Sequence, residues 1–156
     1  MRYFVDAEFN GFGGELISLA AVPETNGSPH FYQAIGCQKP ILWVRTNIIP
    51  VLQIAPRSKG EVAHLFAHYL ENDPAPVLIS DCPESLAHAT LLLADQRGGR
   101  LTAARVRFEL LPASDFSAQA HSETPCNAYR DAIALRDWVL AQEARDRRPG
   151  DLLRVA

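Results

Sequence analysis

The order of its strand-like and helix-like segments is the feature that most constrains how this chain can fold. Three apolar, strand-like segments come first, joined by turns rich in Gly, Pro and Asn: residues 3–7, 15–22 and 30–35. Such turns join neighbouring antiparallel strands, so this part of the chain predicts a meander. A helix, strand, helix, strand and helix are predicted next, at 58–71, 76–80, 83–93, 105–111 and 127–145. This order predicts an α/β fold with helices on the faces of one mixed sheet.

The segments between these elements carry weaker signals. Residues 40–57 are predicted to be irregular, with a short helix within 44–52, and residues 112–125 to form a polar loop. Ser58 and Glu61 have the spacing of a capping box, which predicts the start of the helix at 58–71.

Size and composition narrow the class of protein. The length suits one domain, spanning residues 1–156. No apolar run approaches the ~20 residues of a membrane helix, and an acid follows the N-terminus too closely for a secretory signal, so a cytoplasmic protein is expected. The odd number of scattered cysteines argues against a disulfide framework.

The net charge of −3 does not by itself indicate a nucleic-acid-binding protein. Positive charge is nevertheless concentrated in two segments. Each segment is either a solvated surface or a phosphate contact beside an acidic centre, and both interpretations stay open. The residues concerned are Arg97, Arg100, Arg105 and Arg107 in one segment, and Arg145, Arg147 and Arg148 in the other.

Asp6 and Glu8 lie two residues apart on the first predicted strand. Side chains alternate along a strand, so both carboxylates point to the same face, about 7 Å apart. On a buried strand they repel each other unless a cation lies between them. The alternative is a strand end that emerges into solvent, and the D-x-E pattern alone does not decide between the two.

Two further acids occupy positions where a ligand site is expected. Asp81 ends the strand predicted at 76–80, and α/β sheets bind ligands at the carboxyl ends of their strands. A capping box with Glu84 is the structural alternative. Asp131 lies within the apolar stripe of the last helix, where a lone carboxylate is costly unless it is paired or binds a metal. Its alternative is an acid favoured by the helix dipole.

These acids together predict a metal centre. The four are Asp6, Glu8, Asp81 and Asp131. Four carboxylates can hold two divalent ions about 4 Å apart, and hard oxygen ligands favour Mg²⁺ or Mn²⁺. In such a site one ion activates water and the other stabilises a leaving 3′-oxygen, which is phosphodiester hydrolysis. The four acids are therefore predicted to be metal ligands and catalytic residues.

The three acidic motifs resemble those of the DEDD superfamily of 3′→5′ exonucleases. Residues 4–11, FVDAEFNG, are similar to its first motif, and Asp81 matches the second. Residues 127–132, NAYRDA, are similar to its third motif, H-N-A-x-x-D-A, in the histidine subclass. The motifs keep the family's order over nearly the whole chain. The resemblance to its small bacterial exoribonucleases implies a ribonuclease H-like fold and two-metal hydrolysis of single-stranded or short RNA.

The chain departs from the family at the general base. The histidine subclass has its histidine where this chain has Cys126, and the tyrosine subclass has its tyrosine where this chain has Asn127. Three explanations stay open. His121 acts as the base, since histidine titrates near working pH; metal-activated water suffices at low activity; or the protein has lost catalysis and retained binding. An exposed loop residue is the alternative for His121.

The residues that follow Glu8 are predicted to hold the terminal nucleotide, as this region does in similar enzymes. The substrate-binding residues are predicted to be Phe9, Asn10, Gly11 and Cys126. Phe9 or Phe12 would stack on a base, because RNA bases stack on aromatic side chains. A flexible turn between two strands is the alternative.

Other candidate residues are predicted to be structural. No carboxylate lies at a spacing that completes a metal site with the histidines at 64 and 68, so both are expected at the surface, with His88 on the outer face of its helix. The apolar residues 41–44 and 48–49 either supply a homodimer interface or fill the core.

The leading prediction is a metal-dependent 3′→5′ exoribonuclease that releases nucleoside monophosphates. A catalytically weakened nucleic-acid-binding protein on the same fold is the second hypothesis, because the expected base is missing. A phosphodiesterase acting on small nucleotides is the third. RNA is the expected partner, although no motif in the sequence distinguishes RNA from DNA.

Overall fold

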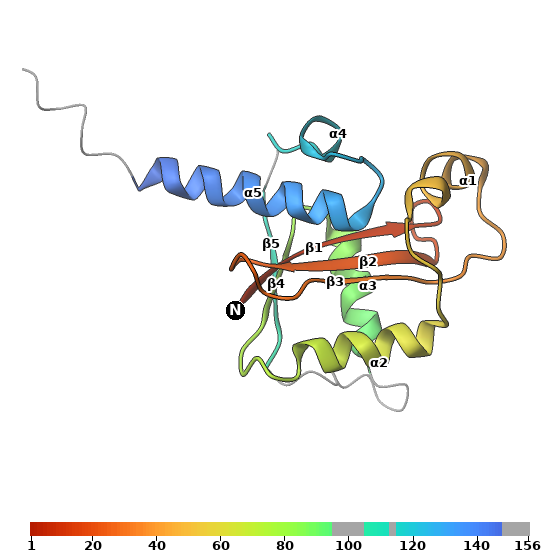
Figure 1. Ribbon diagram of the computed structural model, residues 1–156, viewed down its shortest axis with the longest axis horizontal. Helices are drawn as coiled ribbons and strands as arrows, with labels where there is room; N and C mark the ends of the chain where they lie inside the picture. Colours follow the sequence, from red (N-terminus) through yellow and green to blue (C-terminus); the bar gives the residue numbers. More distant parts are fainter. Residues whose placement is uncertain (95–104, 113–114, 148–156) are drawn as a thin grey trace, which may run out of the picture.

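The chain folds as an α/β structure around one five-stranded mixed sheet, as predicted (Figure 1). The computed structural model describes residues 1–94, 105–112 and 115–147, so Arg97, Arg100 and Arg148 lie outside the described residues. The elements are β1 (Arg2–Phe9), β2 (Leu16–Pro23), β3 (Phe31–Ala34), α1 (Leu42–Asn47), η1 (Ile49–Val51), α2 (Lys59–Leu70), β4 (Val77–Ser80), α3 (Pro83–Leu93), β5 (Arg107–Leu110), α4 (Ala118–His121) and α5 (Ala128–Asp146).

The strand order is β3-β2-β1-β4-β5, which places β1 at the centre of the sheet. β1, β2 and β3 pair antiparallel, so the predicted meander is confirmed. β4 runs parallel to β1, and β5 runs parallel to β4. The carboxyl ends of β1 and β4 therefore meet at one end of the sheet, and this is where Asp6, Glu8 and Asp81 are found.

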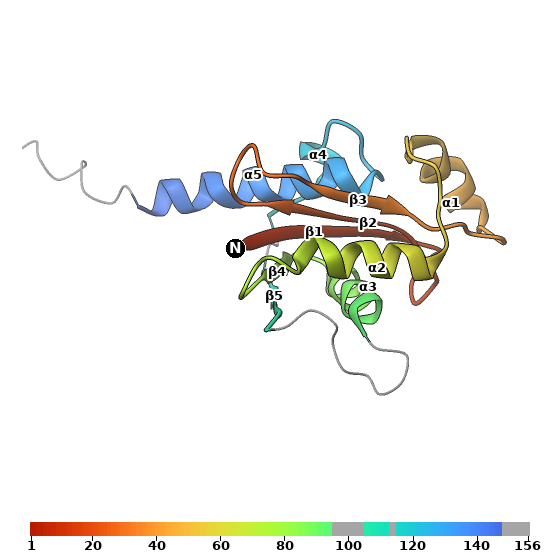
Figure 2. The same cartoon turned by 60° about the horizontal axis from the view of Figure 1, so that its bottom comes forward.

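Helices cover both faces of the sheet (Figure 2). α2 and α3 pack on one face, and α5 crosses the other. Alternation along β1 divides its side chains between these faces: Phe4 packs with Leu135 and Val139 of α5, whereas Val5 packs with Phe66 of α2. Asp6 and Glu8 have the same parity as Phe4, so their carboxylates lie on the α5 side of the sheet.

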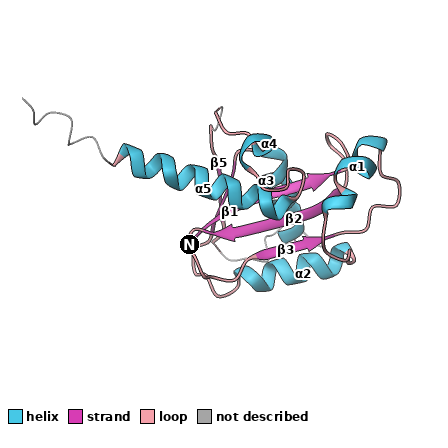
Figure 3. Cartoon of the chain, turned by 45° about the horizontal axis from the view of Figure 1, so that its top comes forward, coloured by secondary structure: helices cyan, strands magenta, loops and turns pink. Residues whose placement is uncertain are grey.

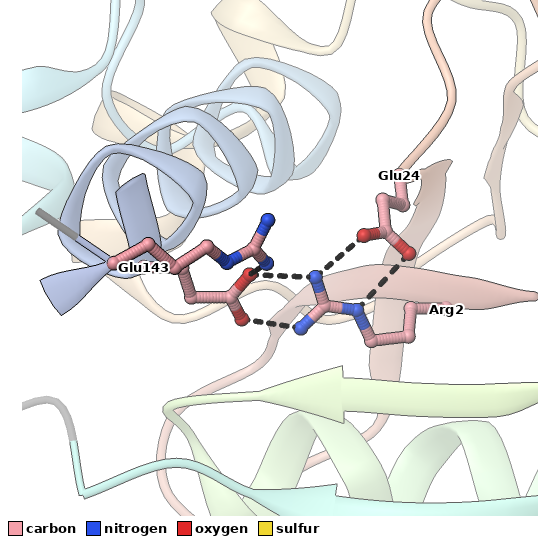
Figure 4. A network of polar contacts seen from close by, with 4 residues as sticks. Arg2, Glu24 and Glu143 are labelled. Atoms are coloured by element: carbon pink, nitrogen blue, oxygen red, sulfur yellow. Dashed lines mark hydrogen bonds and ion pairs between the residues drawn. The ribbon is translucent and has the colours of Figure 1, made fainter. Parts of the chain in front are cut away.

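A network around Arg2 joins the start of β1 to the far end of α5 (Figure 4). The guanidinium Nε donates to Glu24 Oε2 at 3.0 Å, and Nη2 donates to Glu143 Oε2 at 2.9 Å. Glu24 follows β2, so one side chain connects β1, β2 and α5. This network fixes the direction in which α5 crosses the sheet.

Two predicted segments differ from the structure. The single helix expected within 44–52 is instead α1, which begins at Leu42, followed by the 3-10 turn η1. Pro50 lies in the first turn of η1 and has no N–H to continue the hydrogen bonds of α1. The short helix α4 lies within residues 112–125, which were predicted to form a loop. A helix of four residues is too short to give a periodic signal, so the sequence pattern did not predict it.

The predicted start of α2 is confirmed: Ser58 Oγ accepts the N–H of Glu61, and the Glu61 carboxylate accepts the N–H of Ser58. Within the described residues, no helix has the length and apolar character needed to cross a membrane.

Candidate metal centre

Three carboxylates from two distant parts of the sequence meet on the α5 side of the sheet. Asp6 and Glu8 come from β1 and Asp131 comes from α5, and their oxygen atoms lie within 4.8 Å of one another. Asn127 fixes the start of α5 because its Oδ1 accepts the N–H groups of Tyr129 and Arg130. This cap sets Asp131 one turn into the helix, facing β1. The structure thus brings together three of the four predicted acids.

The Asp131 carboxylate is buried, and only one of its two oxygens has a hydrogen-bond partner among the described residues. The residue is only 5% exposed, and its Oδ2 accepts the N–H of Cys126 at 3.0 Å. Its Oδ1 is buried and has no hydrogen-bond partner in the part of the chain that the structure describes. Buried carboxylate oxygens are costly without a partner. A cation held between Asp131, Asp6 and Glu8 would supply that partner.

Asp81 follows β4 and stands beside this group rather than within it. It is not one of the residues whose oxygens lie within 4.8 Å of one another. Its charge nevertheless raises the pKa of both Asp6 and Asp131, so the carboxylates interact. The predicted capping box with Glu84 is wrong: Cys82 precedes α3 without a side-chain cap, and Glu84 Oε1 accepts the N–H of Gly13 at 2.6 Å.

Burial and mutual repulsion raise the pKa values of the clustered acids. Burial, followed by the charges of Glu8 and Asp131, raises the pKa of Asp6 well above its ordinary value. Burial and the Asp131 charge raise the pKa of Glu8 to about 8. The pKa of Asp131 is raised to about 6, mainly by burial, although hydrogen bonds from Ser122 and Cys126 lower it. Bound protons or a divalent cation would relieve this repulsion.

Two serines that the sequence analysis did not single out contact the cluster. Ser85 on α3 accepts the N–H of Ala7 at 3.2 Å, and its Oγ lies 3.5 Å from Asp6 Oδ1. Ser122, between α4 and α5, lies close enough to Asp131 for its hydroxyl to lower the pKa of that carboxyl. Neither serine stands in a pattern that distinguishes it from a surface residue, so only the tertiary structure reveals the contacts.

Cys126 stands at the position where the resemblance noted from the sequence predicts a histidine, and its backbone adopts a left-handed conformation with φ of +67°. The side chain is half-buried beside Val44 and Ile48. Burial raises the pKa of the thiol, and the charges of Glu8, Asp131 and Asp6 raise it further. The thiolate is therefore disfavoured, which argues against Cys126 as a general base.

His121 is the last residue of α4, and α4 lies beside α5 (Figure 3). Its ring stacks on Phe116 with centroids 5.5 Å apart, and Nδ1 lies 2.8 Å from the carbonyl oxygen of Ser117. With Arg130 and Trp138 it lines a cavity of about 270 Å³ on the flank of α5. Asp6, Glu8 and Asp131 do not line this cavity, so His121 must turn from its present contacts to reach the acids.

The predicted nucleotide-binding residues adopt different environments. Phe9 is partly buried, and its ring packs against His88 with centroids 5.4 Å apart. Phe12, in contrast, is 99% exposed. Asn10 holds the neighbouring segment, since Nδ2 donates to the Lys39 carbonyl and Oδ1 accepts the N–H of Ile41. Of the two phenylalanines, Phe12 is the one with a free ring face.

Gly11 has φ of +78° in the turn after β1. A Cβ at this position would lie 3.2 Å from Ile41 Cδ1, so the turn approaches the segment before α1 closely. Glycine adopts the positive φ without strain, and it has no Cβ to press against Ile41.

The remaining histidines and apolar residues divide between surface and interior. His88 was expected on the outer face of α3, and this is wrong: its ring packs on Phe9 and its Nε2 lies 3.8 Å from the Glu84 carboxylate. The residues at the surface are His64, His68, Ile41, Leu42, Trp43 and Ile49. Val44 and Ile48 are buried, so the apolar segments are partly core and partly surface.

The described members of the two basic segments are exposed: Arg105, Arg107, Arg145 and Arg147. Arg147 pairs with Glu143 at 3.3 Å. The structure therefore agrees with two solvated surfaces and leaves phosphate contact as a hypothesis.

No model of a known protein family matches this chain, and no curated protein matches it.

Proposed function

We propose that this protein is a metal-dependent 3′→5′ exoribonuclease with a ribonuclease H-like fold. The observation that carries the proposal is the buried Oδ1 of Asp131, which has no partner among the described residues and lies beside the carboxylates of Asp6 and Glu8. Such a group of oxygens fits a hard divalent cation better than it fits any side-chain partner. The central β1, the parallel β4 and the helix that carries the last acid support the fold assignment.

The residues that would hold Mg²⁺ or Mn²⁺ are Asp6, Glu8 and Asp131, with Asp81 beside them. When bound, the ions would activate water and stabilise the leaving oxygen of a phosphodiester. The backbone N–H of Cys126 orients Asp131, and Ser85 lies against Asp6. These contacts keep the carboxylates in place before any ligand binds, which reduces the reorganisation that binding requires.

The terminal nucleotide would bind between two exposed aromatic side chains. Phe12 follows β1, and Trp43, which is 54% exposed, lies on α1. Asn10 joins the turn that carries Phe12 to the segment before α1 through Lys39 and Ile41. Stacking on aromatic rings holds a base without selecting its identity, which suits a processive or sequence-tolerant exonuclease.

His121 is the favoured candidate for the general base. A carbonyl oxygen only accepts hydrogen bonds, so Nδ1 carries the proton in the contact with Ser117, and the neutral ring keeps Nε2 as an acceptor. His121→Ala is expected to reduce turnover by about 10²- to 10⁴-fold, the typical contribution of a general base.

The proposal is tested with a 5′-labelled RNA oligomer in Mn²⁺. Stepwise shortening and release of nucleoside monophosphates are expected. Asp6→Asn and Asp131→Asn should each reduce the rate about a thousandfold or more, because the carboxylates act as a unit. Glu123→Gln is the matched control, since this carboxylate is 78% exposed. Intact RNA and DNA in either metal would refute the enzyme assignment, and turnover confined to dinucleotides would indicate a small-nucleotide phosphodiesterase.

A weakened nucleic-acid-binding protein is the second candidate, and the raised pKa of the Cys126 thiol favours it. Cys126→His restores the residue of the related enzymes, and histidine tolerates the left-handed backbone found there. A large gain in hydrolysis would support a degenerate enzyme. Tight RNA binding with no turnover in either form would support a binding protein.

A further inference from the structure

Among the described strands β5 forms an edge of the sheet, and its outer side can offer backbone groups to another strand. β4 lies on one side of it, and no described segment pairs with the other side. The N–H groups of Arg107 and Leu111 donate to Pro76 and Ser80, so these residues direct their backbone groups toward β4. Backbone groups of successive residues in a strand point to opposite sides, so Val106, Phe108 and Leu110 direct their N–H and C=O groups away from β4.

The side chains of β5 are unusually exposed for a strand. Arg107, Glu109 and Leu110 are all exposed, with Leu110 52% exposed. Neither Arg107 nor Glu109 forms an ion pair with any other residue in the described ranges. The backbone N–H and C=O groups of an edge strand are a template for pairing with a strand of another chain.

We propose that β5 pairs with β5 of a second copy of this chain, antiparallel and centred on Phe108, so that the two sheets become continuous. In this register the outward backbone groups of Phe108 bond those of Phe108 in the second copy. Those of Val106 bond Leu110 of the second copy in the same way, so every outward N–H and C=O over these residues gains a partner.

The charges of the strand are complementary to themselves in this register. Arg107 lies opposite Glu109 of the second copy, and the two-fold axis repeats the pair. These are positions without direct backbone hydrogen bonds, where Cα atoms approach to about 4.5 Å and side chains contact closely. The same axis sets Val106 against the exposed Leu110. Opposite charges and apolar pairs in facing positions stabilise antiparallel strands.

Neighbouring registers lack this match. A slip of two residues keeps the outward groups paired but sets Arg107 against Arg107, or Glu109 against Glu109, at the axis. Like charges directly opposite each other destabilise a strand pair. Arg105, which would meet Glu109 after one such slip, has φ of +58° and has left the extended conformation. The positions of Arg107 and Glu109 therefore favour one pairing register, and they favour a second copy of this chain as the partner of β5.

The test is the molar mass measured by equilibrium sedimentation from about 5 to about 500 µM, a range suited to a small interface. The native chain should rise from its monomer mass of 17.2 kDa toward twice that value. Arg107→Glu and Glu109→Arg should each weaken self-association at least about tenfold, because each sets like charges opposite each other. The double exchange should restore it.

Mixing the two single variants gives the sharpest outcome. The mixture pairs opposite charges at both positions, so it should form heterodimers more tightly than either variant associates with itself. Leu42→Asp, on the exposed part of α1, is the control and should leave the dimer intact. A native chain that stays monomeric, a mixture no tighter than its components, or a dimer dissociated by Leu42→Asp instead would overturn the proposal.

Discussion

At the scale of single residues, the burial of Asp131 sets how the metal-free protein responds to pH. Its pKa is about 6 in the folded chain, above the ordinary value of 3.8, so the folded state retains a proton that the unfolded chain releases. The protonated Asp131 carboxyl contributes its full stabilisation below pH 3.8, and this contribution is lost as pH rises through the folded-state pKa of about 6. At pH 8 the buried carboxylate is ionised and destabilises the fold.

Asp131→Asn should therefore stabilise the metal-free protein at alkaline pH. The amide keeps an acceptor for the N–H of Cys126 and removes the charge. A gain of about 1–3 kcal/mol is expected at pH 8, with little gain near pH 4. Urea unfolding in EDTA measures it, with the exposed Glu123→Gln as control. Equal or lower stability of Asp131→Asn at pH 8 would show that the carboxylate has a partner in the metal-free chain.

The backbone at residue 126 gives a second prediction at this scale. A side chain at φ of +67° is strained, and glycine is not. Cys126→Gly should be about 1 kcal/mol more stable than Cys126→Ala, because both lack the thiol and only one retains a Cβ. Chemical unfolding of the two variants provides the comparison. An alanine variant as stable as the glycine variant would exclude the left-handed conformation.

At the scale of elements, the position of α5 depends on contacts at its two ends. Asn127 caps the start, and its Nδ2 also donates to the Val51 carbonyl. Arg2 holds the other end through Glu143. These contacts hold both ends of the helix that carries Asp131, so they connect the packing of the helix to the metal centre.

Arg2→Met should destabilise the protein by about 1–2 kcal/mol at pH 7, since a partly buried, bidentate network is lost. Hydrogen bonds from Arg2 lower the pKa values of Glu24 and Glu143, so this stability is present above their ordinary value of 4.5 and is lost as pH falls below it. Unfolding at pH 7 and pH 3 should show a deficit that shrinks in acid. A deficit independent of pH would point to packing instead of charge.

The long elements could be predicted because each has its own periodic or capping signal. The β1–β3 meander, the capped start of α2 and the stripe of α5 are examples. The short helix α4 could not be predicted, since one turn of helix gives no period. The break between α1 and η1 could not be predicted either, because it depends on Pro50. His88 was misplaced because a half-polar ring packed under Phe9 has the same sequence signature as a surface histidine.

At the scale of the whole molecule, the candidate site joins residues that lie far apart in the sequence. Alternation in β1 and the stripe of α5 predicted which way Asp6, Glu8 and Asp131 point, and the structure places them together. The contacts of Ser85 and Ser122 with these acids depend on how α3 and the α4–α5 connection pack, which no local pattern records. The position of His121 beside Phe116 is likewise a tertiary result.

The central claim is that these acids bind a divalent cation, and calorimetric titration of the metal-free protein with Mn²⁺ at pH 7.5 tests it most directly. Binding should be tighter than about 1 mM and should release protons, because the Glu8 carboxyl, with a pKa of about 8, is largely protonated beforehand. Asp131→Asn should abolish binding, and Glu123→Gln should leave it unchanged. No binding by the native chain, or equal binding by Asp131→Asn, would contradict the account.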